Sequence, residues 1–220
     1  MSVVLAQVVR SGFIESEHRG SVVSLDTGGT TVFALGDTEV PIFPRSSLKP
    51  LQVVGMLRAG LSLAPADIAL AAASHSGEAK HVSRVRDLLH HAGLPESALA
   101  CPPSLPLSEE SAQAVIRAGG GPSRVQMNCS GKHAAMLLTC RAAGWPIEGY
   151  TDPGHPVQKA IRSAVEDLAG ETVAAVGVDG CGAPVFATSL CGLARSFARL
   201  AQAEPGSPER AVADAMRAHP

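Results

Sequence analysis

The N-terminal part of the chain alternates β-rich runs with turn residues. Three runs, Val3 to Val9, Ser21 to Asp26 and Thr30 to Leu35, are rich in residues that favour strands. Gly28 and Gly29 separate the second run from the third, and glycine readily adopts the positive φ of a tight hairpin turn. The pattern therefore predicts antiparallel strands at the start of the chain.

After Pro44 the apolar positions change to a helical spacing. They recur every three residues and are followed by a glycine, in the series Leu48, Leu51, Val54, Leu57 and Gly60. Pro50 is tolerated only in the first turn, where its missing N–H has no intrahelical partner to lose. The helix is therefore predicted to begin near Ser46 or Ser47.

The next apolar run, Ile68 to Ala73, is short and ends in a polar turn, Ser74 to Glu78. This pattern predicts a buried strand. Helices are then predicted over six further segments: Val82 to Gly93, Ser108 to Gly119, Gly131 to Ala143, Pro156 to Leu168, Leu190 to Ala203 and Pro208 to Ala218. Thr172 to Val178 is a second strand candidate, and it leads into a glycine-rich turn.

Composition narrows the class of protein. The 220 residues are 45% apolar and 17% charged, which is enough for a real core. A net charge of −2 and 3% aromatic residues argue against a nucleic-acid or membrane surface and favour a small polar ligand. The five cysteines show no paired spacing, so a reducing compartment is expected. The early apolar run lacks a basic leader, which favours a cytoplasmic protein.

One short stretch concentrates reactive groups. Asn128 to Met136 brings a thiol, an amine and an imidazole (Cys129, Lys132 and His133) to the start of a predicted helix. Cys181 lies in the later glycine-rich turn, and two thiolates can begin a zinc site. Four ligands are usual, however, so buried structural thiols are the alternative.

An S-x-x-K tetrad, Ser46-Ser47-Leu48-Lys49, places a hydroxyl and an amine one helical turn apart. Such a lysine acts as a base only if burial or a neighbouring cation lowers its pKa, and Arg45 is the candidate neighbour. A serine cap followed by a solvated lysine is the alternative.

Other polar residues have open interpretations. Ser74 and His75 follow the predicted strand, a common place for reacting groups, while Ser76 is expected to cap the next helix. Asp179 either accepts hydrogen bonds from a ligand amino group or organises its own turn. His133 either meets a ligand carboxylate or supports the start of its helix.

The segment Asp26 to Thr30 looks like the phosphate loop of actin-like ATPases, in which backbone N–H groups hold phosphate oxygens. No second phosphate or adenosine motif follows it. We therefore interpret this segment as a hairpin turn.

Taken together, four motifs closely resemble the Rhizobium-type L-asparaginases, the class 3 or asparaginase II family: Arg45-Ser46-x-x-Lys49-Pro50, Ala73-Ser74-His75, Asn128 to His133 and Asp179-Gly180-Cys181. The resemblance covers essentially the whole chain as a single domain, 1–220. It implies an α/β fold similar to serine β-lactamases and glutaminases, with helices packed on a central antiparallel sheet, in a cytoplasmic homodimer.

The resemblance also implies roles. Ser46 would be the nucleophile, Lys49 its activating base and Ser74 a proton relay or oxyanion ligand. Cys129, Lys132 and Cys181 would hold zinc, which positions substrate. Arg45, His133 and Asp179 would hold the amino and carboxylate groups of L-asparagine.

Family members continue beyond Pro220 and supply a second catalytic lysine there, so the resemblance implies a chain that lacks the family's C-terminal part and has reduced activity. The first hypothesis is an amidohydrolase that converts L-asparagine to L-aspartate and ammonia through a serine acyl-enzyme. A zinc-dependent amino-acid-binding protein without turnover is the alternative.

Overall fold

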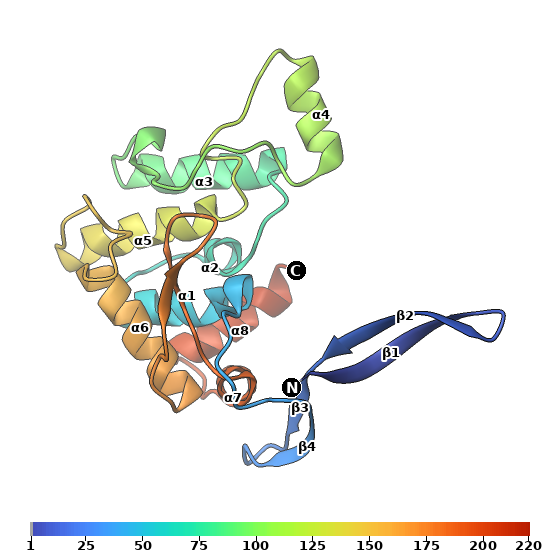
Figure 1. Ribbon diagram of the computed structural model, residues 1–220. Coiled ribbons are helices and arrows are strands. Elements are labelled where there is room, and N and C mark those ends of the chain that lie inside the picture. Colours follow the sequence, from blue (N-terminus) through green and yellow to red (C-terminus); the bar gives the residue numbers. More distant parts are fainter. Residues whose placement is uncertain (1) are drawn as a thin grey trace.

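The computed structural model describes residues 2–220, and within them it forms a helical body with small antiparallel sheets. The first sheet pairs β1 (Val3–Arg10) with β2 (Phe13–Gly20), and the second pairs β3 (Val22–Leu25) with β4 (Thr31–Leu35). The β1–β2 hairpin projects away from the body as an arm (Figure 1). Antiparallel strands at the N-terminus are confirmed, and β2 is a strand that the sequence pattern did not predict.

Helices form the body. After a 3₁₀ turn at Arg45–Leu48, the chain runs through α1 (Lys49–Arg58), α2 (Pro65–Ala72), α3 (Ala79–His91), α4 (Glu109–Arg117), α5 (Ser130–Ala143), α6 (Pro156–Ala169), α7 (Leu190–Gln202) and α8 (Pro208–Ala218). A short 3₁₀ turn, Glu96–Ala98, follows α3. The third sheet, β5 (Val176–Val178) with β6 (Pro184–Phe186), lies between α6 and α7 in the chain.

The strand predicted over Ile68 to Ala73 is wrong, because these residues belong to α2 and its C-cap. Pro65 stands at the first turn and Asp67 follows it, which is a typical helix start. The run itself is rich in alanine, a strong helix former that is depleted in strands. A short apolar run cannot be assigned by periodicity alone.

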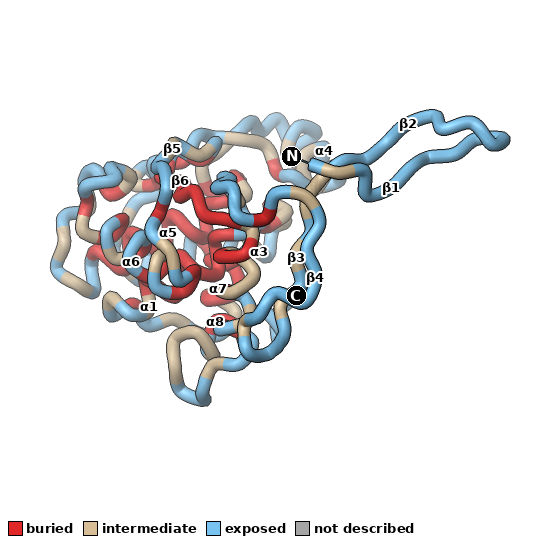
Figure 2. Tube along the Cα trace, turned by 60° about the horizontal axis from the view of Figure 1, so that its bottom comes forward, coloured by how far each residue is buried: buried red, intermediate tan, exposed pale blue. Residues whose placement is uncertain are grey.

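The sheet arrangement also differs from the expectation. An α/β composition is confirmed, but the described residues form three separate two-stranded sheets instead of one central antiparallel sheet. The strands β1 to β4 are largely exposed, and apart from the contact between β3 and α7 they offer little surface on which helices could pack (Figure 2). Helices therefore pack mainly on one another.

The core lies where α1 meets α2, α5 and α6. Residues of α1 from Lys49 to Met56 are buried, and Gly55 lets α6 approach so closely that a Cβ there would lie 2.8 Å from the Ile161 Cα. Gly131 plays the same part between α5 and α2, because a Cβ there would lie 2.9 Å from the Leu70 carbonyl oxygen. The first contact holds α1 against α6, and the second holds the start of α5 near the end of α2.

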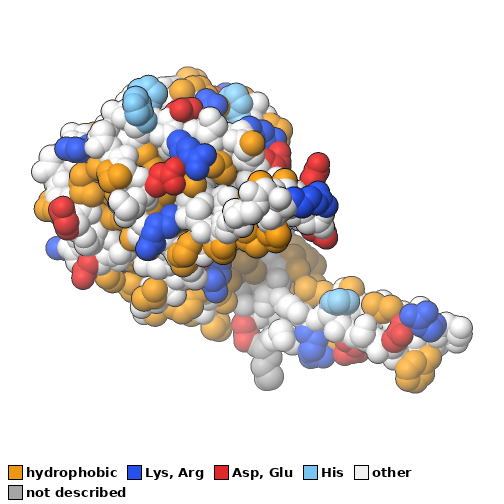
Figure 3. Space-filling view, turned by 90° about the horizontal axis from the view of Figure 1, so that it is seen from above, with side chains coloured by type: hydrophobic (Ala, Val, Ile, Leu, Met, Phe, Trp, Pro, Cys, Tyr) orange, Lys and Arg blue, Asp and Glu red, His pale blue; other side chains and the backbone are white. Residues whose placement is uncertain are grey.

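The arm has a different surface. Figure 3 shows hydrophobic, basic and acidic side chains mixed along it. Phe13 is 72% exposed at its tip. An isolated two-stranded hairpin is marginally stable in water, so the arm adds little to the core.

Candidate active site

Four segments that are distant in the sequence meet at the candidate site. They are the 3₁₀ turn with the start of α1, the loop after α2, the start of α5 and the turn between β5 and β6. The His75 backbone N–H donates to the Asn128 carbonyl at 3.2 Å, which ties the loop after α2 to the segment before α5. The β5–β6 turn is tied to the 3₁₀ turn by Arg45 and Asp179.

Ser46, Ser74 and Lys49 form a continuous hydrogen-bonded chain. Lys49 Nζ lies 2.7 Å from Ser74 Oγ, and Ser74 Oγ lies 2.9 Å from Ser46 Oγ. The expected direct contact between Ser46 and Lys49 is replaced by this relay. Ser46 belongs to the 3₁₀ turn and Lys49 begins the α-helix, and Lys49 Nζ also donates to the Ala73 carbonyl at 2.8 Å. The amine therefore points toward the loop after α2.

The three residues of this hydrogen-bonded chain differ in how far they are buried. Ser46 and Ser74 are exposed, whereas Lys49 is only 1% exposed. Removal from water disfavours the charged amine, so burial lowers the pKa of Lys49 below its ordinary value. The Cys129 thiolate opposes this shift and the Lys132 ammonium group reinforces it. The cation near Lys49 is thus Lys132, where the sequence suggested Arg45.

Arg45 instead pairs with Asp179, with 2.5 Å between Nε and Oδ1. Arg45 adopts a left-handed backbone conformation (φ 55°), which is strained for a residue with a side chain. Asp179 Oδ1 also accepts the Gly180 N–H at 2.9 Å. Burial raises the pKa of Asp179, but the Gly180 N–H and Arg45 outweigh it, so the pKa is lowered overall. Asp179 is therefore a fixed carboxylate beside the serine chain.

Cys129 and Cys181 face each other across the interface between α5 and the β5–β6 turn. A hydrogen bond from Cys181 lowers the pKa of Cys129 to about 6, against the effect of burial. The Cys129 thiolate and burial together raise the pKa of Cys181 to about 11. Two buried sulfurs cannot both ionise easily, so this pair retains one proton between them. Lys132 Nζ lies 3.3 Å from Cys181 Sγ.

This donor set suits a cation that prefers sulfur and nitrogen ligands. Within residues 2–220, however, no three His, Cys, Asp or Glu side chains are grouped closely enough to hold a metal ion. A zinc site here depends on the Lys132 amine as the third protein ligand. The residues therefore fit zinc only through that unusual ligand.

His133 lies in the first turn of α5 and has no exposed surface. The Tyr150 hydroxyl oxygen accepts the Ala100 N–H at 2.8 Å, and that hydroxyl lies 2.7 Å from His133 Nδ1. Nε2 has no hydrogen-bond partner in the described part of the chain. Burial lowers the pKa of His133, while Cys181 acts in the opposite direction. The sequence analysis missed Tyr150, for which the only signal was that the chain has a single tyrosine.

The buried His75 supports the loop after α2, which carries Ser74. Its Nδ1 accepts the Gly77 N–H at 3.1 Å, so its Nε2 carries the proton and donates to Ser130 Oγ at 2.9 Å. Ser130 Oγ in turn donates to the Val125 carbonyl at 2.8 Å. Burial lowers the pKa of His75 to about 4. Ser76 does not cap α3 as expected, because its hydroxyl donates to Glu78 Oε1 at 2.6 Å.

A cavity of about 680 Å³ opens beside Ser74 and His75, between α2, the start of α3 and the end of the chain. Glu78, Lys80, His81 and Arg84 give its wall charged groups of both signs. Its volume falls within the range of small-molecule sites. Ser74, the middle member of the hydrogen-bonded chain, therefore borders a space large enough for an amino acid, whereas Ser46 is not among the residues that line it.

The sequence matches the family model for L-asparaginase II over residues 6–220, essentially the whole chain. The chain belongs to the L-asparaginase II family. No curated protein gives a significant match. Membership supports an amidohydrolase-type enzyme and asparagine hydrolysis as the general reaction. None of the helices in the described range has the length and apolarity that a membrane crossing needs.

Proposed function

We propose that this asparaginase-family chain hydrolyses the side-chain amide of L-asparagine through an acyl-enzyme on Ser46. The observation that carries the proposal is the hydrogen-bonded chain from Ser46 Oγ through Ser74 Oγ to the buried Lys49 Nζ. In the structure Lys49 Nζ donates to both the Ser74 hydroxyl and the Ala73 carbonyl. When the amine loses its proton, its lone pair accepts the Ser74 O–H instead, while one N–H still donates to Ala73.

Proton transfer follows this chain. As Ser46 Oγ bonds to the amide carbon, its proton passes to Ser74 and the Ser74 proton passes to Lys49. The Lys49 ammonium then returns a proton through Ser74 to the departing nitrogen, because Ser46 Oγ now carries the acyl group, so the C–N bond breaks and ammonia leaves. Water then bonds to the ester carbon while the neutral Lys49 amine takes its proton through Ser74. The bond from that carbon to Ser46 Oγ breaks, Lys49 returns the proton to Ser46 Oγ, and L-aspartate leaves.

Substrate recognition is proposed for Arg45 and Asp179. An exposed guanidinium suits the α-carboxylate of asparagine, and a fixed carboxylate suits its α-ammonium group. Both lie on the segments that flank Ser46. His133 is completely buried, so its predicted contact with substrate requires the pocket to open.

Zinc is proposed to bind Cys129, Lys132 and Cys181, where it would position substrate and shape the pocket. The support is that two thiols and an amine converge in a buried position. Protein purified without chelator should contain zinc, and a Cys129→Ser, Cys181→Ser double variant should lose it. Cys140→Ser is the matched control, because Cys140 is buried elsewhere on α5. Zinc that survives the double substitution would show that the ligands are wrong.

The S-x-x-K pair at the start of a buried helix also supports the proposed kinship with serine β-lactamases and glutaminases. The homodimer remains a prediction, which size-exclusion chromatography with light scattering tests.

A reactive asparagine analogue that bonds to the nucleophile tests the central claim. Mass spectrometry should locate the adduct on Ser46, and Ser46→Ala should form none while Ser47→Ala still does. An adduct on Ser47 or Ser74 would refute the assignment. Asparagine binding with no ammonia release by the unmodified chain would favour the amino-acid-binding alternative.

A further inference from the structure

A second cavity, of about 370 Å³, lies between the β3–β4 turn and helix α7. Its lining combines the backbone of Thr27, Gly28 and Gly29 with the side chains of Arg195 and Arg199. None of these residues belongs to the candidate active site. The cavity therefore calls for a separate explanation.

Each of the two guanidinium groups is held by a hydrogen bond to the protein and keeps further N–H donors without a partner in the range that the structure describes. Arg195 Nη1 donates to the Ala169 carbonyl, and Arg199 Nη1 donates to the Asp167 carbonyl, both at the C-terminal end of α6. Nε and Nη2 of both side chains have no hydrogen-bond partner in the described part of the chain. A guanidinium has five N–H donors, so each arginine keeps several for a ligand.

The glycine turn contributes further donors. The turn's own hydrogen bonds use the N–H groups of Asp26, Gly29 and Thr30. The N–H groups of Thr27 and Gly28 have no partner among residues 2–220. Successive backbone N–H groups in such a turn form a recognised anion-binding arrangement. The hairpin predicted from the sequence is confirmed, and it lies against two cations.

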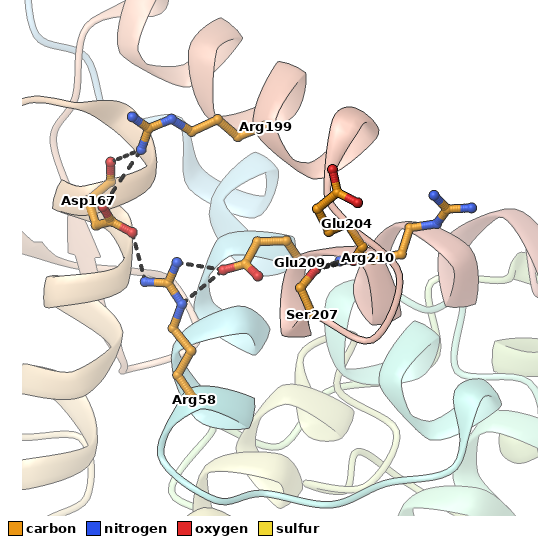
Figure 4. Close-up of polar contacts among 7 residues, drawn as sticks. All are labelled: Arg58, Asp167, Arg199, Glu204, Ser207, Glu209 and Arg210. Atoms are coloured by element: carbon orange, nitrogen blue, oxygen red, sulfur yellow. Dashed lines mark hydrogen bonds and ion pairs between the residues drawn. The ribbon is translucent and has the colours of Figure 1, made fainter.

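Of the two arginines that line this cavity, Arg199 lies near one carboxylate, and Arg195 lies near none that the structure describes. Asp167 lies between Arg58 and Arg199, with Oδ2 2.8 Å from Arg58 Nη1 and Oδ1 3.7 Å from Arg199 Nη1 (Figure 4). Arg58 also contacts Glu209. Arg195 forms no ion pair with a described carboxylate. The Asp26 carboxylate accepts the Thr30 N–H at 2.8 Å.

We propose that this cavity binds the phosphoryl group of a small phosphorylated molecule. A phosphoryl group presents three oxygens in different directions, which matches donors that converge from a backbone turn and two planar guanidinium groups. A carboxylate has only two oxygens in one plane and would leave some of these donors unused. The cavity volume leaves room for an organic group attached to the phosphate.

Isothermal titration of the whole chain with pyrophosphate, and separately with inorganic phosphate, tests the proposal. Binding of pyrophosphate is expected, and Arg195→Gln/Arg199→Gln should weaken it at least about tenfold, since hydrogen bonds to charged groups contribute roughly 1.5–3 kcal/mol each. Arg162→Gln and Arg210→Gln together are the matched control, because they remove the same charge from helix positions outside the cavity. The control should bind pyrophosphate like the unmodified chain.

Arg199→Lys provides a second variant in case the double substitution impairs folding. It keeps the charge but loses the planar fork, so pyrophosphate should bind about threefold to tenfold more weakly. Equal affinities in the arginine variants and the control would overturn the proposal. Displacement of pyrophosphate by equimolar L-aspartate would also overturn it, because a carboxylate ligand would then fit the cavity as well. Ammonia release is not needed for this test, so its outcome is independent of the proposed reaction.

Discussion

The projecting arm leaves large apolar side chains exposed, whereas the helical body buries some charged and polar side chains within its apolar core. In the arm, Phe13 is 72% exposed, whereas in the body Lys49 is 1% exposed. A two-stranded ribbon has no second layer, so its apolar side chains remain in water. The body can bury an amine because a carbonyl and a hydroxyl accept its N–H groups. Reactivity therefore belongs to the region that can hold a polar group away from water.

The largest expected effect comes from removing the buried amine. Lys49→Met should lower kcat/KM for asparagine by about 10²–10⁴-fold, the usual contribution of a positioned base. Lys159→Met, at an exposed position of α6, is the control and should leave ammonia release unchanged. In the unmodified protein kcat/KM should rise with pH as Lys49 loses its proton, with a midpoint below the ordinary lysine pKa. Equal rates in the two variants would remove Lys49 from the mechanism.

The second-largest effect is expected for side-chain truncation, which should lower the free energy of unfolding in the body but not in the arm. Leu51→Ala in α1, where the side chain is fully buried, should lower the free energy of unfolding by about 2–5 kcal/mol. Val9→Ala in the arm, where the side chain is 58% exposed, should change it by no more than about 0.5 kcal/mol. Urea denaturation measures both. A large effect of Val9→Ala would mean that the arm is packed in solution.

The pH dependence of stability should also differ between the two regions, and one histidine in each region tests this. Burial lowers the His75 pKa from 6.5 to about 4. Between these two pH values the unfolded chain therefore binds one proton more than the folded chain. The folded state should therefore lose roughly 3 kcal/mol of stability as pH falls through this window, and keep it above pH 6.5. His75→Gln should remove this dependence, whereas His18→Gln on the exposed arm should not. Denaturation at a series of pH values distinguishes the two variants.

The smallest effect is expected for the arm's ion pairs. Arg10 Nη2 lies 2.9 Å from Glu15 Oε2, but the two side chains are 75% and 44% exposed. Arg10→Ala should cost no more than about 1 kcal/mol, and less at high salt. A measurable drop in ammonia release would show that the arm contributes to the active site.

Much of the secondary structure followed from local patterns. Periodicity located the long helices, and Ser108 and Ser207 cap α4 and α8, each accepting a backbone N–H at 3.2 Å. The exception was α2, where an alanine-rich run of only eight residues fits either a buried strand or a helix. The pattern also missed β2, because its only large apolar residues, Phe13 and Ile14, stand together at its start and polar residues follow them.

The sequence by itself determined which reactive residues the chain has and the family to which their motifs belong. The tertiary structure decided how they connect. It showed that Ser74, which is 28 positions from Ser46, stands between Ser46 and Lys49, that Lys132 is the cation beside Lys49, and that Arg45 turns to Asp179. It also placed the β3–β4 turn against Arg195 and Arg199. Local spacing controls contacts within one helical turn, but contacts between distant segments depend on how the helices pack, and no short motif encodes that packing.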